Sequence, residues 1–167
     1  MTLDTSAIKS LRDSTGAGIM DCKKALEKAN GDLSGAQEIL RGKGIALAAK
    51  KADRQVTEGL IETYVHVGNR IGAIVEVNCE TDFVARTPEF KQLAHDLAMQ
   101  IAAMDPKFIG DQDVADIPKE SPKEAILLQQ LYIKDPSMSI QDLLNEVVGK
   151  VGENIRIRRF SRFLLGE

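Results

Sequence analysis

Apolar residues recur every three or four positions in the first 42 residues, which predicts three short helices. The first helix is expected to begin after Asp4, a good N-cap, and to end near Ser14, before the glycine-rich "TGAG". The second, "IMDCKKALEKA", ends at Asn30-Gly31, and the third ends near Gly42. These helices predict a minimal bundle, whose second and third helices would turn inward Ile19, Cys22, Leu26, Ala29, Leu33, Ala36, Ile39 and Leu40.

Residues 43–55, "KGIALAAKKADRQ", are rich in Ala and Lys and predict a connecting helix. The composition changes at Val56, and the period of the apolar pattern changes there from helical to alternating. We therefore expect two domains, residues 1–55 and residues 56–167.

Two alternating runs then predict a β-hairpin. In the first run, apolar or β-branched residues occupy alternate positions from Ile61 to Val67, and "GN" at 68–69 marks the turn. The second run places five side chains on one face of a strand: Ile71, Ala73, Val75, Val77 and Cys79.

Helix signals follow the hairpin. Thr81 is placed to cap a short turn, and Thr87-Pro88 begins a helix with a clear apolar stripe. A capping-box pattern at 121–124 predicts a short helix through about Tyr132, and Ser139 is expected to cap another.

The closing "ENIRIRRFSRFLL" alternates like a strand, but its apolar phase slips between Ile157 and Phe160, which predicts a β-bulge. This strand would return to the hairpin and complete an antiparallel, three-stranded sheet packed with helices. The fold class predicted for the whole chain is α+β.

Composition limits which residues can form the core and indicates where in the cell the protein is located. Apolar residues make up 43% of the chain and aromatic residues only 4%, so the core must consist mainly of Leu, Ile, Val and Ala. Cys22 and Cys79 each lie in an apolar pattern, as in reduced intracellular proteins. No stretch approaches the roughly 20 apolar residues of a membrane span. The N-terminal "MTLDTSAIKS" lacks the apolar core of a signal peptide, so a cytoplasmic location is expected.

Motifs of enzymes and cofactor sites are largely missing. His66 and His95 lie far apart, and neither has metal-ligand spacing to a cysteine. The "RGKG" at 41–44 follows a helix, whereas a phosphate-binding loop would open one after a strand. The "IRIRRFSRF" at 155–163 could suit RNA, but arginines also protect an exposed sheet edge from aggregation, and we favour that interpretation. We expect no catalysis, cofactor, metal or direct nucleic-acid binding.

The "CETDFVAR" at 79–86 contains an unusual feature, because Asp82 and Phe83 stand side by side at a strand-to-helix corner. A carboxylate suits the start of a helix, whereas such a corner rarely needs a large aromatic side chain. From the residues alone we favour the interpretation in which Phe83 packs back into the core and Asp82 only caps the turn; the alternative is that Phe83 binds a partner.

Three separated motifs resemble one protein family. "LRDSTGAGIMDCKKALEKANGDLSGAQEILRGKG" is very similar to the N-terminal segment of the elongation factor Ts family. "VEVNCETDFVAR" and the closing "KVGENIRIRRFSRF" resemble two later signatures of that family, in the same order. The N-terminal bundle also looks like a ubiquitin-associated domain.

The resemblance implies a nucleotide exchange factor for the GTPase elongation factor Tu, acting by binding and not as an enzyme. The matching residues of the bundle, which would grip the GTPase, are Arg12, Ile19 and Met20; Ile19 replaces the methionine usual in the family. The matching exchange wedge is Thr81, Asp82, Phe83 and Val84, with Phe83 entering beside the Mg²⁺ and phosphate site of the partner.

Long family members carry two copies of the core, a protruding helical hairpin and a C-terminal helix module. This chain shows one core copy, a shortened "SPKEAILLQQLYIKD" in place of the hairpin, and no such module before Glu167. The resemblance is thus to short members, and it implies a homodimer. Two rival functions remain: an adaptor that uses only the bundle, and an RNA-binding ribosome accessory protein that uses "RIRRFSR".

Overall fold

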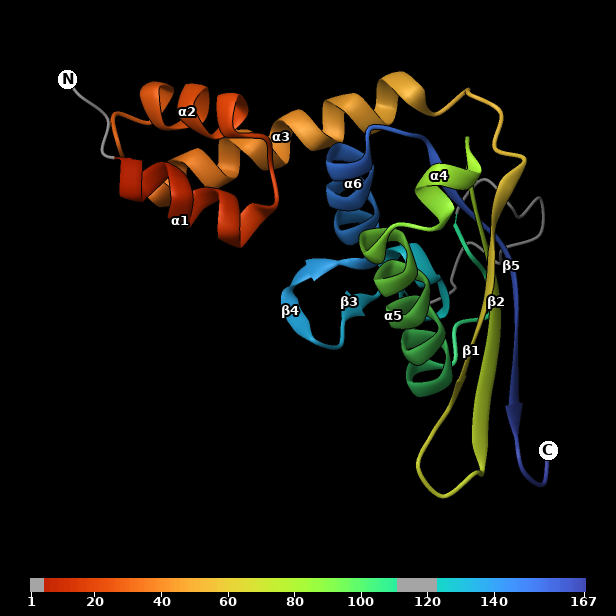
Figure 1. The fold of residues 1–167 in the computed structure, drawn as a ribbon. Helices are drawn as coiled ribbons and strands as arrows, with labels where there is room; N and C mark the ends of the chain where they lie inside the picture. Colours follow the sequence, from red (N-terminus) through yellow and green to blue (C-terminus); the bar gives the residue numbers. More distant parts are fainter. Residues whose placement is uncertain (1–4, 111–122) are drawn as a thin grey trace.

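A computed structural model describes residues 5–110 and 123–167. Figure 1 shows a small helical bundle at one end, a long helix leading away from it, and a sheet whose one face carries the remaining helices. Two separate hydrophobic clusters correspond to the bundle and to this larger α+β part. The predicted fold class is confirmed.

The bundle consists of α1 (Thr5–Thr15), α2 (Ile19–Lys28) and the first half of α3 (Leu33–Lys51). The side chain of Asp32 accepts a hydrogen bond from Gly35 N and caps α3. The Asp4 cap predicted for α1 lies outside the described residues. A small core holds the three helices together, formed by Leu11, Cys22, Ala25, Leu26 and Ala36.

Helix α3 does not end near Gly42, so that prediction was wrong. It continues without a break to Lys51, and its second half packs against α6 (Ile140–Val151). A Cβ added at Gly44 would lie 3.3 Å from the carbonyl oxygen of Asn145, so glycine allows the two helices to approach closely. The helix persists because this tertiary contact outweighs the modest helix-weakening effect of glycine. As a result, α3 spans both hydrophobic clusters.

Three antiparallel strands form the main sheet in the order β1 (Glu58–Val65), β2 (Ile71–Cys79) and β5 (Ile155–Leu164). Strand β2 is central and presents its predicted apolar face to the core. The predicted bulge is confirmed: Val77 pairs with Ile157 and Glu76 with Arg159, which leaves Arg158 as the extra residue.

The inner face of the sheet is covered by α5 (Pro88–Met104), and α6 packs against α5 (Figure 1). Thr87 caps α5, with Pro88 in its first turn, as predicted. Ser139 and Asp142 form a capping box at the start of α6, and Gly152 ends that helix with a positive φ of 75°.

The helix predicted to reach Tyr132 is absent from the described part of that segment, and Ser121 and Pro122 of its predicted cap lie outside it. Residues from Lys123 form two short 3₁₀ turns, Lys123–Ala125 and Leu127–Gln129. A two-stranded ribbon follows, β3 (Leu131–Tyr132) and β4 (Asp135–Ser139). Tertiary hydrogen bonds explain the difference, because Leu127 N donates to Phe108 O and the Gln100 side chain donates to Leu131 O.

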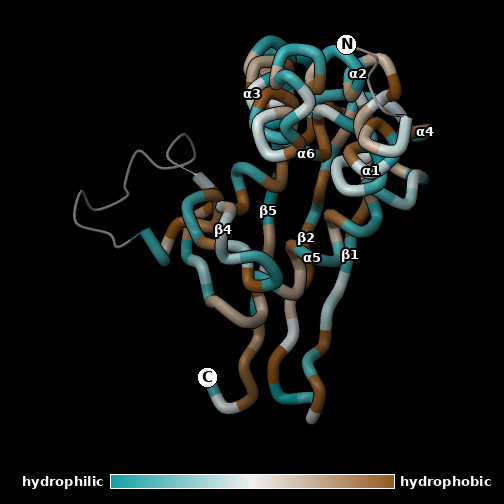
Figure 2. The backbone as a smooth tube through the Cα atoms, turned by 90° about the vertical axis from the view of Figure 1, so that its left-hand side faces the viewer, coloured by the Kyte–Doolittle hydropathy of each residue, from teal (hydrophilic) through white to brown (hydrophobic). Residues whose placement is uncertain are grey.

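The outer face of the sheet is not covered by any described helix (Figure 1). Its exposed apolar side chains gather toward the free ends of the strands, where Figure 2 shows hydrophobic segments below the helices. Val65, Gly72 and Phe163 lie directly opposite one another across the three strands. The exposed apolar residues of what we call the outer patch are Ile61, Val65, Val67, Ile74, Phe163 and Leu165.

The β1–β2 pairing yields a stability prediction. Gly59 has a φ of 149°, and an added Cβ would lie only 2.1 Å from Val77 O, whereas a Cβ at Gly72 would lie 3.4 Å from Tyr64 O. We expect Gly59→Ala to lower the free energy of unfolding by about 2–4 kcal/mol, through the clash and the backbone strain. Gly72→Ala is the control on the same hairpin and should change it by less than about 1 kcal/mol. Urea denaturation of the two variants checks this, and equal stability would contradict it.

Candidate partner-binding site

The Asp82–Phe83 corner is a single helical turn, α4 (Asp82–Ala85), between the end of β2 and the start of α5. Thr81 caps it as predicted, with its hydroxyl oxygen 3.5 Å from the Val84 nitrogen. Val84 is buried in the main core. Phe83, its neighbour, leaves 78% of its surface exposed.

This exposure separates the two interpretations of Phe83. A Phe in the core would be buried, as Phe90 is seven residues later with no exposed surface. Large exposed aromatic side chains on soluble proteins often mark interaction sites, and aromatic residues are enriched at the energetic centres of interfaces. The core alternative for Phe83 is therefore wrong.

The carboxylate of Asp82 is also accessible. Its Oδ2 lies 2.8 Å from Nη2 of Arg86, one turn later, and this ion pair is largely exposed to solvent. Exposed pairs of this kind contribute little to stability, so Asp82 can exchange its partner without a large loss. The corner thus presents an aromatic ring and a negative charge side by side.

A network of polar side chains supports the corner from behind. The Glu80 carboxylate accepts a hydrogen bond from Asn154 N at 2.7 Å and lies 3.4 Å from Nη1 of Arg54. The hydrogen bond from Asn154 N has the largest effect on the pKa of Glu80, and together with the Arg54 contact it holds that pKa below its ordinary value. The Asn154 side chain in turn donates to the carbonyl oxygens of Ala52 and Arg54. The network joins the end of β2 to the start of β5 and to the segment after α3.

The residues predicted for the bundle's contact lie around the connection between α1 and α2. Arg12 is exposed in the last turn of α1, and its carbonyl oxygen accepts a hydrogen bond from Gly16 N. Ile19 and Met20 begin α2 with 54% and 61% of their surfaces exposed. Ile19 therefore does not belong to the bundle core, in contrast to the inward position predicted for it. The inward position predicted for Leu33 is also wrong, because Leu33 begins α3 with 43% of its surface exposed.

The structure does not bring the two sets of predicted residues together. The α1–α2 connection lies beside α6, where a Cβ added at Gly16 would come within 2.8 Å of the Lys150 side chain, and α4 lies on the other side of α6 (Figure 1). Any single partner that contacts both sets must therefore be large, which favours a protein over a small molecule.

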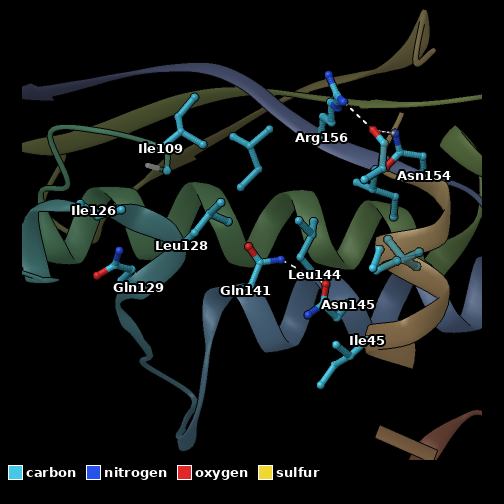
Figure 3. Close-up of a pocket in the computed structure, with 17 residues that line it drawn as sticks. Ile45, Ile109, Ile126, Leu128, Gln129, Gln141, Leu144, Asn145, Asn154 and Arg156 are labelled. Carbon is cyan, nitrogen blue, oxygen red and sulfur yellow. Dashed lines mark hydrogen bonds between the residues drawn. The ribbon is translucent and has the colours of Figure 1, made fainter. Parts of the chain in front are cut away.

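One groove of the structure lacks the charged side chains of a typical catalytic site. It has a volume of about 590 Å³ and lies between α3, α6 and the start of β5 (Figure 3). Apolar and amide side chains dominate its lining, and Arg156 is the only charged residue among those that line it. Among the described residues there is no cluster of three or more potential metal ligands from His, Cys, Asp and Glu.

Neither cysteine is suited to nucleophilic chemistry. Both Cys22 and Cys79 are buried and free of disulfides. Burial raises the pKa of Cys79 to about 11, so that its thiol stays protonated at neutral pH. In the described parts of the chain, no helix combines the length and hydrophobicity that a membrane crossing requires.

Comparison with known proteins places these features in a family. The chain is 49% identical to elongation factor Ts of Carboxydothermus hydrogenoformans over 195 residues, covering 99% of this chain and 90% of that protein. The chain belongs to the elongation factor Ts family. Its match with elongation factor Ts of Caldanaerobacter subterraneus is 48% identical and covers 98% of that protein. The match with that of Herpetosiphon aurantiacus is 46% identical and covers 99% of it.

The family profile described as "Elongation factor TS" matches residues 44–121, which include the whole Asp82–Phe83 corner. The bundle lies before that range, but the full-length relatives cover it. Alignments with elongation factor Ts relatives run over 195 residues or more, whereas this chain has 167, so the relatives contain residues that this chain lacks.

The residues that support the corner, above all Glu80, Glu153 and Asn154, were not predicted from the sequence. They contact one another across more than 70 positions of the chain, so no local pattern could reveal the contact. The one signal was their presence within the quoted motifs "CETDFVAR" and "KVGENIRIRRFSRF".

Proposed function

We propose that this member of the elongation factor Ts family promotes the release of GDP from elongation factor Tu by inserting Phe83 beside the nucleotide site. The observation that carries this proposal is the 78% exposure of Phe83 on a capped, supported corner. An aromatic side chain held away from its own core is ready to enter a pocket of a partner, and burying it there is worth about 1.5–3 kcal/mol.

The mechanism follows from thermodynamic linkage. A GTPase holds GDP through backbone donors, a lysine and Mg²⁺. If Phe83 and Asp82 favour a geometry of the nucleotide site in which Mg²⁺ and phosphate are poorly coordinated, the factor weakens the binding of GDP. By linkage, GDP then weakens the binding of the factor by the same ratio. No covalent bond is made or broken, so the protein is an exchange factor and not an enzyme.

The bundle supplies affinity in this proposal. Arg12, Ile19 and Met20 are exposed around one connection, and exposed apolar and arginine side chains often dominate the energy of an interface. The distance between the bundle and α4 lets the factor hold the GTPase at one place while it disturbs the nucleotide site at another.

Substitution of Met20 tests the role of the bundle. We expect Met20→Ala to weaken binding of elongation factor Tu about tenfold, because an interface anchor is worth more than about 1.4 kcal/mol. The maximal rate of GDP release at saturating factor should stay the same. Leu33→Ala is the matched control, since Leu33 is an exposed apolar residue of the same bundle on α3. Titration calorimetry and stopped-flow exchange check both values, and full affinity in Met20→Ala would contradict the assignment.

One experiment tests the function as a whole. Release of a fluorescent GDP analogue from elongation factor Tu is followed with and without this protein. An adaptor that uses only the bundle would bind without accelerating release, and an RNA-binding protein would retain single-stranded RNA in a filter assay without affecting the GTPase. Acceleration of release that is lost with Phe83 supports exchange.

The outer patch supports a second part of the proposal, a homodimer through the sheet. Burying the uncovered apolar face of the sheet against a second copy of the chain is energetically favourable, and a twofold axis is the simplest arrangement. Phe163 and Val65 flank Gly72 on this face, with 69% and 60% of their surfaces exposed.

A further inference from the structure

Glu153 makes an unusual set of contacts with the corner that carries Phe83. It lies between the end of α6 at Gly152 and the start of β5. Its Oε2 accepts hydrogen bonds from Glu80 N at 3.1 Å and Thr81 N at 3.0 Å, and its Oε1 accepts one from the Thr81 hydroxyl at 2.6 Å. One carboxylate thus binds three donors at the end of β2.

These contacts determine how Thr81 can act as a cap. Because its hydroxyl proton is directed to Glu153, a lone pair of the same oxygen remains for Val84 N. The backbone N–H of Thr81 is held by the same carboxylate, so both the rotamer and the backbone of the cap are set from outside the corner.

The corner needs such support because it is short. Helix α4 has four residues, and a single turn of helix is not stable by itself. Val84 and Ala85 pack into the core on one side, but Phe83 projects into solvent and makes little contribution to holding the turn. The Glu153 contacts add to this packing and to the Glu80–Asn154 hydrogen bond, and they are the contacts that reach the Thr81 cap itself.

We propose that Glu153 is a positioning residue for exchange, which holds the Thr81 cap so that Phe83 meets the partner in one orientation. The proposal rests on the function proposed above and extends it to a residue 70 positions beyond Phe83. Glu153 does not touch the partner in this scheme; it acts through Thr81 and α4. Preorganisation of this kind raises the rate of the step that Phe83 performs and leaves the bundle's contribution to affinity unchanged.

Exchange kinetics of the full chain test the proposal. Glu153→Gln keeps the size of the side chain but has one acceptor oxygen in place of two, and Glu153→Ala removes both. We expect the maximal rate of GDP release to fall about tenfold or more in Glu153→Ala and less in Glu153→Gln, with a half-saturating concentration that changes less than about twofold. The control is Glu146→Gln on α6, an exposed acid paired with Lys150, which should leave both values unchanged.

A double variant shows whether Glu153 acts through Phe83. In the Phe83→Ala background, Glu153→Ala should cause no further loss, since there is no ring left to position. A full additional loss in that background, or an unchanged maximal rate in both single variants, would overturn the proposal. The function itself is judged by Phe83→Ala alone, so the two failures are distinguishable.

Amide hydrogen exchange gives a measurement that does not depend on activity. In Glu153→Gln, well below its unfolding temperature, the Glu80 and Thr81 amides should lose protection, whereas amides in the middle of β2 should keep it. Unchanged protection at Glu80 and Thr81 would overturn the positioning role even if exchange were impaired.

Discussion

Replacing Phe83 by Ala is expected to reduce the stimulation of GDP release about ten- to a hundredfold while leaving thermal unfolding unchanged. The ring is 78% exposed, so its removal deletes little from the protein's own core. In the complex the same ring would be buried, and losing about 1.5–3 kcal/mol of burial corresponds to that range of rates. Stopped-flow release of a fluorescent GDP analogue and a thermal melt measure the two effects.

Phe90 provides the matched control for this experiment. It has no exposed surface and lies seven residues later, in the first turns of α5. Phe90→Ala should lower the free energy of unfolding by about 3–5 kcal/mol through the cavity that it leaves. If Phe83→Ala exchanged normally, or melted as early as Phe90→Ala, the wedge role of Phe83 would be wrong.

The contrast between these two phenylalanines illustrates the limits of sequence reasoning. Periodicity predicted α5 and its stripe correctly because Phe90 repeats with Leu93, Leu97 and Ile101 on a buried face. Phe83 belongs to no periodic pattern, and a single residue beside a cap is compatible with burial or exposure. The resemblance to the family suggested exposure, and in the structure Val84 and Ala85, not Phe83, belong to the main core at this corner.

Predicted boundaries of helices were wrong where tertiary contacts outweighed the local secondary-structure preference of the sequence. Glycine at position 42 suggested a helix end, but α3 continues because its second half packs on α6. The segment after Lys123 has helical character in sequence, yet the backbone N–H groups of Leu127 and Leu128 donate to the carbonyl oxygens of Phe108 and Ile109. A local sequence pattern cannot predict hydrogen bonds between segments that are far apart in the chain. The contacts of Glu153 with Glu80 and Thr81 are another example.

The sheet shows a third kind of limit. The alternation of β1 was predicted, but not which side of the strand faces the core. Leu60 and Tyr64 pack inward, and the apolar Ile61 and Val65 face outward. An apolar residue on both faces of a strand is what a sheet buried on two sides requires. The outward set is therefore evidence for a second covering layer.

Phe163→Asp should abolish the proposed homodimer at micromolar concentration. In a twofold arrangement each substitution occurs twice in one interface. Loss of two buried rings at about 1.5–3 kcal/mol each weakens association at least about a hundredfold, and the burial of two carboxylates near each other weakens it further. The fold of the single chain should be unaffected, because the Phe163 side chain is 69% exposed in it.

Sedimentation equilibrium of the full chain between about 1 and 100 µM measures this effect, with the native sequence expected to show the mass of two chains. Leu131→Asp is the matched control, since Leu131 is 60% exposed but lies on β3, away from the three-stranded sheet. It should leave the dimer intact, because the added charge remains in solvent. A native chain with the mass of one copy throughout the range would exclude the dimer. A dimer that survives Phe163→Asp but dissociates with Leu131→Asp would move the interface from the outer patch to the β3–β4 ribbon.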